Sequence, residues 1–99
     1  MNNISLSYFI TVAEEENISN AARKLFITQQ SLSEHIKKLE KNYNAVFFER
    51  TPRLKLTYQG ERMLAYAYKV IEAERMLNES LRQDSQFERV RLTIGEASV

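Results

Sequence analysis

Residues 18–40 read ISNAARKLFITQQSLSEHIKKLE, and this pattern predicts two helices that meet at a tight turn. In the first half, Ser19 is a good N-cap, and the small side chains of Ala21 and Ala22 allow another helix to approach closely. In the second half, Thr28 is a suitable N-cap for a helix whose apolar residues recur at helical spacing. These apolar residues are Leu32, Ile36, Leu39 and Tyr43.

The residues on either side extend this pair of helices into a larger domain. Apolar residues at three- and four-residue spacing predict a first helix from about Ile4 to Glu16. After the third helix, Asn44 is a suitable left-handed terminator. Two short segments, 46–50 and 54–56, then predict a hairpin in which Pro52 sets the bend.

The expected fold is mainly α, a winged helix–turn–helix followed by a long dimerisation helix. The winged domain would occupy residues 1–58, with the helix–turn–helix at about 18–37 and the wing at about 46–56. A linker helix would occupy residues 59–87, and residues 88–99 would begin a further, truncated domain.

The segment from Tyr58 to about Ser85 predicts one long helix, because helix formers dominate it and it contains no proline. Thr57 can cap it, and roughly 28 residues at about 1.5 Å each make a helix about 42 Å long. That is more than one small domain needs, so we expect the apolar residues of this helix to join two copies in a homodimer. These residues are Met63, Leu64, Ala67, Tyr68, Val70, Ile71, Leu77 and Leu81. The alternative is a capping helix in a monomer.

The last residues show a different pattern. Residues 90–95, VRLTIG, alternate apolar and polar side chains and predict a strand. A lone strand is not stable, and the chain offers it no partner. We therefore interpret this segment as the first strand of a missing domain, and the chain as a fragment.

The net charge of +1 conceals an uneven distribution. Residues 1–18 carry three acidic groups and no basic group, whereas residues 19–58 carry eight basic groups and three acidic ones. Residues 59–99 carry six basic and seven acidic groups. The predicted helix–turn–helix and wing therefore form a basic island, as binding to a polyanion requires.

Composition excludes several other classes of protein. There is no cysteine and only one histidine, His35, so we expect neither a metal site nor a cofactor, and His35 is interpreted as a packing or surface residue. No credible nucleophile–base pair supports an enzyme. No apolar run approaches the roughly 20 residues of a membrane span, and the N-terminus lacks the features of a signal peptide. We expect a reduced, cytoplasmic protein that does not enter a membrane.

The polar side of the third helix fits the major groove of double-stranded DNA, whose width accepts one α-helix. Its first turns carry amides and a hydroxyl that reach base edges, and lysines follow within reach of the phosphates. Arg53 and Lys55 on the wing would lie where a wing meets DNA, while Arg50 is interpreted as structural, pairing with Glu40 or Glu49. The alternative is a protein-interaction module that uses the same fold without DNA.

These residues together resemble the N-terminal segment of LysR-type bacterial transcriptional regulators. The resemblance covers residues 1 to about 60 in unbroken register. It is carried by Leu6-x-x-Phe9, Ile18-Ser19-Asn20-Ala21-Ala22-x-x-Leu25, Thr28-Gln29-Gln30-Ser31-Leu32-Ser33, Phe48-Glu49-Arg50 and Leu56-Thr57-x-x-Gly60.

The resemblance implies a dimer on an interrupted inverted repeat, or a tetramer in the full-length protein. It also implies a small-molecule effector bound by a later domain that these residues lack. Base-reading or phosphate-contacting positions fall on Gln29, Gln30, Ser33 and Glu34, and a wing contact on Arg53. The full set that we expect at DNA is Thr28, Gln29, Gln30, Ser31, Ser33, Glu34, Lys37, Lys41, Arg53 and Lys55.

Two of these positions depart from the family pattern. Gln30 stands where the family most often has proline, and Glu34 stands where arginine is frequent. Both changes alter the groups offered to the bases, so the preferred DNA sequence is expected to differ within the family.

Overall fold

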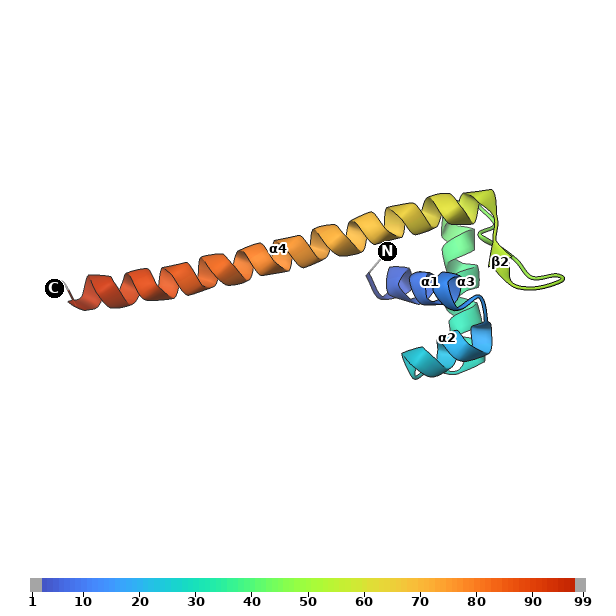
Figure 1. Ribbon diagram of the computed structural model, residues 1–99, viewed down its shortest axis with the longest axis horizontal. Coiled ribbons are helices and arrows are strands. Elements are labelled where there is room, and N and C mark those ends of the chain that lie inside the picture. The colour runs from blue at the N-terminus through green and yellow to red at the C-terminus, as the bar shows by residue number, and fades with distance from the viewer. Residues whose placement is uncertain (1–2, 98–99) are drawn as a thin grey trace.

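Three short helices, a small hairpin and one long helix follow one another along the chain in the computed structural model (Figure 1). The structure describes the backbone of residues 3–97 and the side chains of residues 4–85. The elements are α1 (Asn3–Glu15), α2 (Ile18–Leu25), α3 (Gln29–Tyr43), β1 (Phe48–Glu49), β2 (Lys55–Leu56) and α4 (Tyr58–Ala97). The mainly α, winged helix–turn–helix fold with a long helix is confirmed.

Local side chains fix where α2 and α3 begin. The Asn17 side chain accepts a hydrogen bond from the Asn20 N–H at 2.9 Å, so Asn17 caps α2, and the prediction of Ser19 as the cap is wrong. Asparagine is as good an N-cap as serine, and here it comes first along the chain. Thr28 caps α3 as expected, since its Oγ1 accepts from the Ser31 N–H at 3.0 Å.

The helix ends also follow local chemistry. Asn44 terminates α3 in the left-handed conformation, with φ of 50°, as the sequence predicts. Phe26 ends α2 in the same conformation, with φ of 58°, and its N–H bonds back to carbonyls of α2. The turn to α3 is therefore tight, and α3 lies across α1 and α2 (Figure 1).

A single core holds the four helices and the hairpin together. Phe9 of α1 is fully buried at its centre, with its ring centroid 5.5 Å from that of Phe47 and 5.2 Å from that of Phe48. The other buried side chains are Leu6, Val12, Ala13, Ala21, Ala22, Leu32, Ile36, Leu39, Met63 and Ala67. Three of these lie on α3 and fix which side of that helix faces outward.

The wing is shorter than the sequence predicts. β1 and β2 have two residues each, with Phe48 opposite Leu56 and Glu49 opposite Lys55 in an antiparallel pair. Val46 does not extend β1, because its N–H donates to Gln59 and its carbonyl accepts from the Thr57 hydroxyl. The loop between the strands projects at the end of the molecule opposite the tip of α4 (Figure 1).

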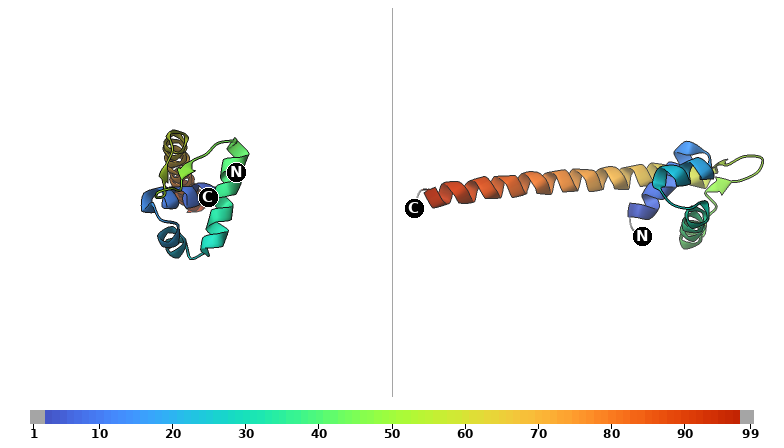
Figure 2. Two further views of the ribbon diagram at one scale, coloured as in Figure 1. Left: turned by 90° about the vertical axis from the view of Figure 1, so that its right-hand side faces the viewer. Right: turned by 90° about the horizontal axis from the view of Figure 1, so that it is seen from below.

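The helix α4 is longer than predicted, and this overturns one expectation. It runs from Tyr58 to Ala97, so residues 90–95 are helical, and the prediction of a strand there is wrong. No partner strand is present in the described part of the chain, whereas a helix satisfies its backbone hydrogen bonds within itself. Figure 2 shows α4 projecting far beyond the other elements, and the molecule measures 71 × 25 × 19 Å.

The first turn of α4 passes very close to the segment before the wing. Thr57 caps it, accepting from the Gly60 N–H at 3.0 Å, and the Thr57 N–H donates to the Phe47 carbonyl at 2.9 Å. A Cβ on Gly60 would lie 2.1 Å from that carbonyl oxygen. Only glycine fits here without a backbone shift.

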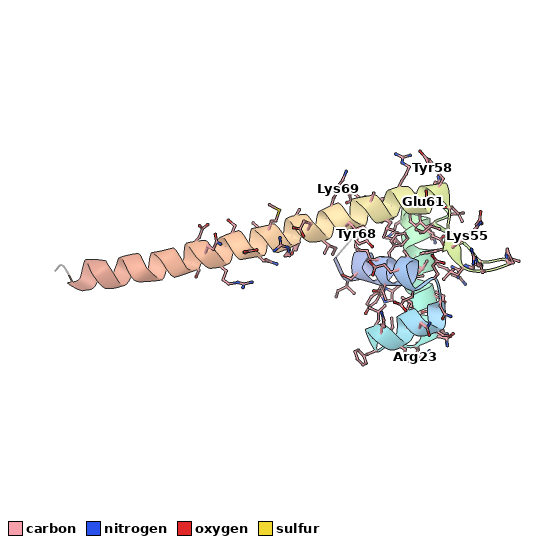
Figure 3. All side chains as sticks on the ribbon, viewed as in Figure 1. Arg23, Lys55, Tyr58, Glu61, Tyr68 and Lys69 are labelled. Atoms are coloured by element: carbon pink, nitrogen blue, oxygen red, sulfur yellow. The ribbon has the colours of Figure 1, made fainter. Side chains whose placement is uncertain are left out.

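We predict that Gly60→Ala lowers the free energy of unfolding by about 1–3 kcal/mol, because the added methyl group overpacks the joint with Phe47. Urea denaturation followed by circular dichroism measures the change. Lys69→Ala is the control, since Lys69 points away from α1–α3 and should change stability by less than about 0.5 kcal/mol (Figure 3). A Gly60→Ala variant as stable as its parent would contradict the close contact.

Candidate nucleic-acid interface

One face of α3 is turned to solvent along its whole length. Because the inner face is set by the buried Leu32, Ile36 and Leu39, helical geometry places the opposite face outward. The residues on this outward crest are Gln30, Glu34, Lys37 and Lys41, all of them exposed. We call these four residues the α3 crest.

The other predicted residues of α3 lie at its beginning or beside the crest. Thr28 and Gln29 are exposed, whereas Ser31 and Ser33 are half-buried. Thr28 holds the first turn, which contains no acidic residue. The free peptide N–H groups and the positive end of the helix dipole there attract anions such as phosphate.

A side-chain contact links the first two residues of the α3 crest. Gln30 Nε2 donates to Glu34 Oε1 at 3.5 Å, one helical turn apart. This long hydrogen bond joins two exposed residues that lie one turn apart on the α3 crest.

The lysines of the α3 crest are available for phosphate. Lys37 and Lys41 form no ion pair in the described part of the chain, whereas Lys24 on α2 pairs with Glu15 at 2.7 Å. That hydrogen bond to Glu15 raises the pKa of Lys24 above its ordinary value. Within the described residues of the basic island, Lys24 is therefore neutralised by an ion pair, whereas Lys37 and Lys41 are not.

Of the two wing cations predicted to contact DNA, Lys55 forms an ion pair and Arg53 forms none with any residue that the structure describes. Arg53 is exposed in the loop, and Lys55 pairs with Glu49 at 3.5 Å. The expectation that Arg50 pairs with Glu40 or Glu49 is wrong: Glu40 accepts from the Phe47 N–H at 2.7 Å, and Glu49 is taken by Lys55. α3 and the wing lie at the same end of the molecule, with Lys55 at the base of the loop (Figure 3).

The structure places the predicted dimerisation residues in four different environments. Met63 and Ala67 are buried in the core of their own chain, and Leu64, Val70 and Ile71 are half-buried against it. Tyr68 donates a hydrogen bond to Glu14 of α1, which raises the pKa of the Tyr68 phenol. Leu77 and Leu81 are 53% and 54% exposed and lie beyond the domain.

Sequence reasoning missed a groove at the junction of α3 and α4. It has a volume of about 440 Å³ and lies beside Tyr43, Gln59, Arg62, Tyr66 and their neighbours. Burial and contact with Tyr66 raise the pKa of Tyr43. No sequence signal marks this groove, because its walls come from segments that only the fold brings together.

The described part of the chain holds no cluster of three histidine, cysteine, aspartate or glutamate side chains that suits a metal ion. His35 packs edge-on against Tyr8, with ring centroids 4.9 Å apart, as its packing interpretation predicts. Within these same residues, no helix has both the length and the apolar character of a membrane span.

Both a family profile and individual protein sequences match this chain. The profile of the family described as "Bacterial regulatory helix-turn-helix protein, lysR family" matches residues 5–61. The HTH-type transcriptional regulator BsdA of Bacillus subtilis is 40% identical over 68 residues, which are 67% of this chain and 23% of that protein. ClcR of Pseudomonas putida is 45% identical over 67 residues, again 67% and 23%. The chain spans about a quarter of the length of such relatives.

Solved structures agree in fold. The crystal structure of the CbnR_DBD–DNA complex has a TM-score of 0.82 at 30% identity, covering 86% of this chain and 99% of that one. BenM_DBD in complex with catB site 1 DNA has a TM-score of 0.75 at 33% identity, covering 83% and 94%. Both solved structures hold DNA.

We predict that Thr28→Ala lowers the free energy of unfolding by about 1 kcal/mol, because the Ser31 N–H loses its cap. Thr28→Ser keeps the hydroxyl and should stay near the parent value. Thermal or urea denaturation without DNA compares the three proteins. Equal losses in both variants would show that the hydroxyl is not what stabilises the start of α3.

Proposed function

Since the chain belongs to the lysR family of bacterial regulatory helix-turn-helix proteins, we propose that it is the DNA-binding part of a transcriptional regulator. The observation that carries this proposal is the α3 crest, an exposed polar row with two unpaired lysines. Such a row suits the major groove, which displays hydrogen-bonding groups between two lines of phosphates. The relatives named as transcriptional regulators and the solved DNA complexes support the same conclusion.

The residues divide into two roles in this proposal. Lys37, Lys41 and the N-terminus of α3 would bind phosphates and supply most of the affinity. Gln29, Gln30, Ser33 and Glu34 would lie nearest to the base edges and supply discrimination. Thr28 and Ser31 would support the start of α3 beside a phosphate. In the wing, the exposed Arg53 would contact DNA next to the recognition helix, with Lys55 assisting once its weak pair with Glu49 opens.

We further propose that α4 joins two copies. All residues from 72 to 85 are exposed, although an apolar stripe continues through them from the domain. The stripe consists of Tyr66, Val70, Ala73, Leu77 and Leu81. Pairing two such helices would bury the stripe and place the two α3 helices on the half-sites of an interrupted inverted repeat.

An antiparallel pairing explains the groove as well as the stripe. It would lay the far half of α4 from a second copy beside the groove at the junction of α3 and α4. Arg62 at the groove and Asp84 on the far half each lie eleven positions from Ala73, so a pairing centred there brings opposite charges together. A parallel pairing would instead place Arg62 beside Arg62 of the second copy, which brings like charges together. The apolar stripe of the second copy would then not fill the groove.

The remaining properties concern the whole protein. We propose that residues 1–58 form the DNA-binding domain, that the linker covers about 59–87, and that an effector-binding domain begins near residue 88. The effector would be a small molecule, and the full-length assembly a dimer or a tetramer in the cytoplasm. Since the relatives are transcriptional regulators, we assign the chain no enzymatic role.

We predict that Lys37→Ala weakens binding to all duplexes alike and lowers the slope of log affinity against log salt by about one unit. The probes are a duplex that the protein selects from a random-sequence pool and a scrambled duplex, titrated by fluorescence anisotropy. Lys69→Ala removes an exposed lysine on the outer side of α4 and should change neither quantity (Figure 3).

Two results would count against this proposal. An unchanged salt slope in Lys37→Ala would remove Lys37 from the contact surface. Failure of the parent protein to bind any duplex at low salt, together with a stable dimer, would favour the protein-interaction module instead.

We predict that Leu77→Arg raises the dissociation constant of the dimer at least about tenfold, because it places a charge in the apolar stripe. Sedimentation equilibrium measures this constant. Gln83→Arg adds the same charge away from the stripe and should leave it unchanged. Equal constants for the two variants would show that α4 does not pair through this stripe.

A further inference from the structure

The Gln30–Glu34 pair occupies the part of the α3 crest that would enter a groove first. Both residues are exposed, one turn apart, and lie opposite the buried face of α3. Lys37 and Lys41 follow towards the C-terminal end of the helix. The pair therefore stands between the anion-attracting helix start and the free cations.

The Glu34 carboxylate keeps most of its hydrogen-bonding capacity. Its one hydrogen bond within the described residues is the 3.5 Å bond from Gln30 Nε2. Lys37 and Lys38 lie three and four positions further on, yet neither forms an ion pair with it. Gln30 thus contacts the carboxylate through one long hydrogen bond and adds no opposite charge to it.

A carboxylate at this place has few acceptable hydrogen-bond partners among the bases of DNA. Guanine and thymine present acceptors to the major groove, and thymine adds a methyl group. Adenine presents a donor, N6, but beside the acceptor N7, which repels a carboxylate. Cytosine presents the N4 amino group as a donor with no acceptor of its own beside it, and it is the base that glutamate and aspartate read.

Building on the proposed DNA binding, we infer that the Gln30–Glu34 pair selects a cytosine in each half-site by accepting a hydrogen bond from its N4 amino group. Glu34 makes the contact, and Gln30 is a positioning residue. The carboxylate also repels phosphates and the acceptor edge of guanine, so it lowers affinity for unselected DNA. The two effects together raise discrimination more than affinity.

The test is selection of duplexes from a random-sequence pool by the parent protein and by variants. The parent should select a half-site with one position at which cytosine is preferred over guanine roughly tenfold or more. Glu34→Gln should lose most of that preference and bind scrambled duplex more tightly. Glu34→Arg should reverse the preference, so that guanine replaces cytosine at that position of the same strand. Gln30→Ala should weaken the preference for cytosine without abolishing it.

Glu61→Gln is the matched control, because it removes the same charge from an exposed position on α4 (Figure 3). It should select the parent half-site. A second measurement uses the selected duplex with the cytosine replaced by 2-pyrimidinone, which lacks the N4 amino group. The replacement should reduce the affinity of the parent about tenfold and that of Glu34→Gln much less.

These outcomes distinguish the cytosine contact from the proposed DNA binding on which it rests. If the parent selects no sequence at all, the proposed function fails. If the parent selects a half-site and Glu34→Gln selects the same bases at every position with the same strength, the proposed function stands and the cytosine contact is overturned. Equal losses for both proteins on the pyrimidinone duplex would overturn it as well.

Discussion

The peptide unit at Phe47 is the joint on which the arrangement of this molecule depends. Its N–H donates to Glu40 of α3 at 2.7 Å, and its carbonyl accepts from the Thr57 N–H at 2.9 Å while touching Gly60 at the start of α4. The ring of Phe47 packs on Phe9 in the core. Phe47 thus connects α3, the wing and α4 through its backbone.

This joint explains why the two proposed surfaces are separate. The first turns of α4 are tied to the core, which leaves α3 with its polar side outward and sends the rest of α4 away from the domain (Figure 1). The proposed DNA contacts lie on α3 and the wing, and the proposed dimer contacts lie on α4. Because one continuous helix spans the two, the length of α4 would set the spacing of the half-sites in the proposed dimer.

The sequence predicts those features that depend on residues close together in the chain. Thr28 can be predicted as the cap of α3 because the capping hydrogen bond spans only three residues. Asn17 is not predicted as the cap of α2, because two suitable capping residues compete at the start of that helix. Tertiary contacts cannot be predicted from the sequence pattern. Val46 does not join the wing, because its backbone is hydrogen-bonded to Thr57 and Gln59 at the start of α4. Met63 packs in the core of its own chain instead of facing a second copy. Residues 90–95 alternate as a strand does but are helical, because a short alternating pattern cannot supply a partner strand.

The most direct test of DNA binding by α3 and the wing is the change in backbone amide NMR signals of the ¹⁵N-labelled protein when a duplex selected from a random pool is added at low salt. Binding through these two elements predicts that signals from residues 28–41 and 51–55 shift, while those from residues 72–85, on the exposed half of α4, keep their positions in the free dimer. Shifts confined to α4, or no shifts at any duplex concentration, would contradict the claim that the outward face of α3 and the wing bind DNA.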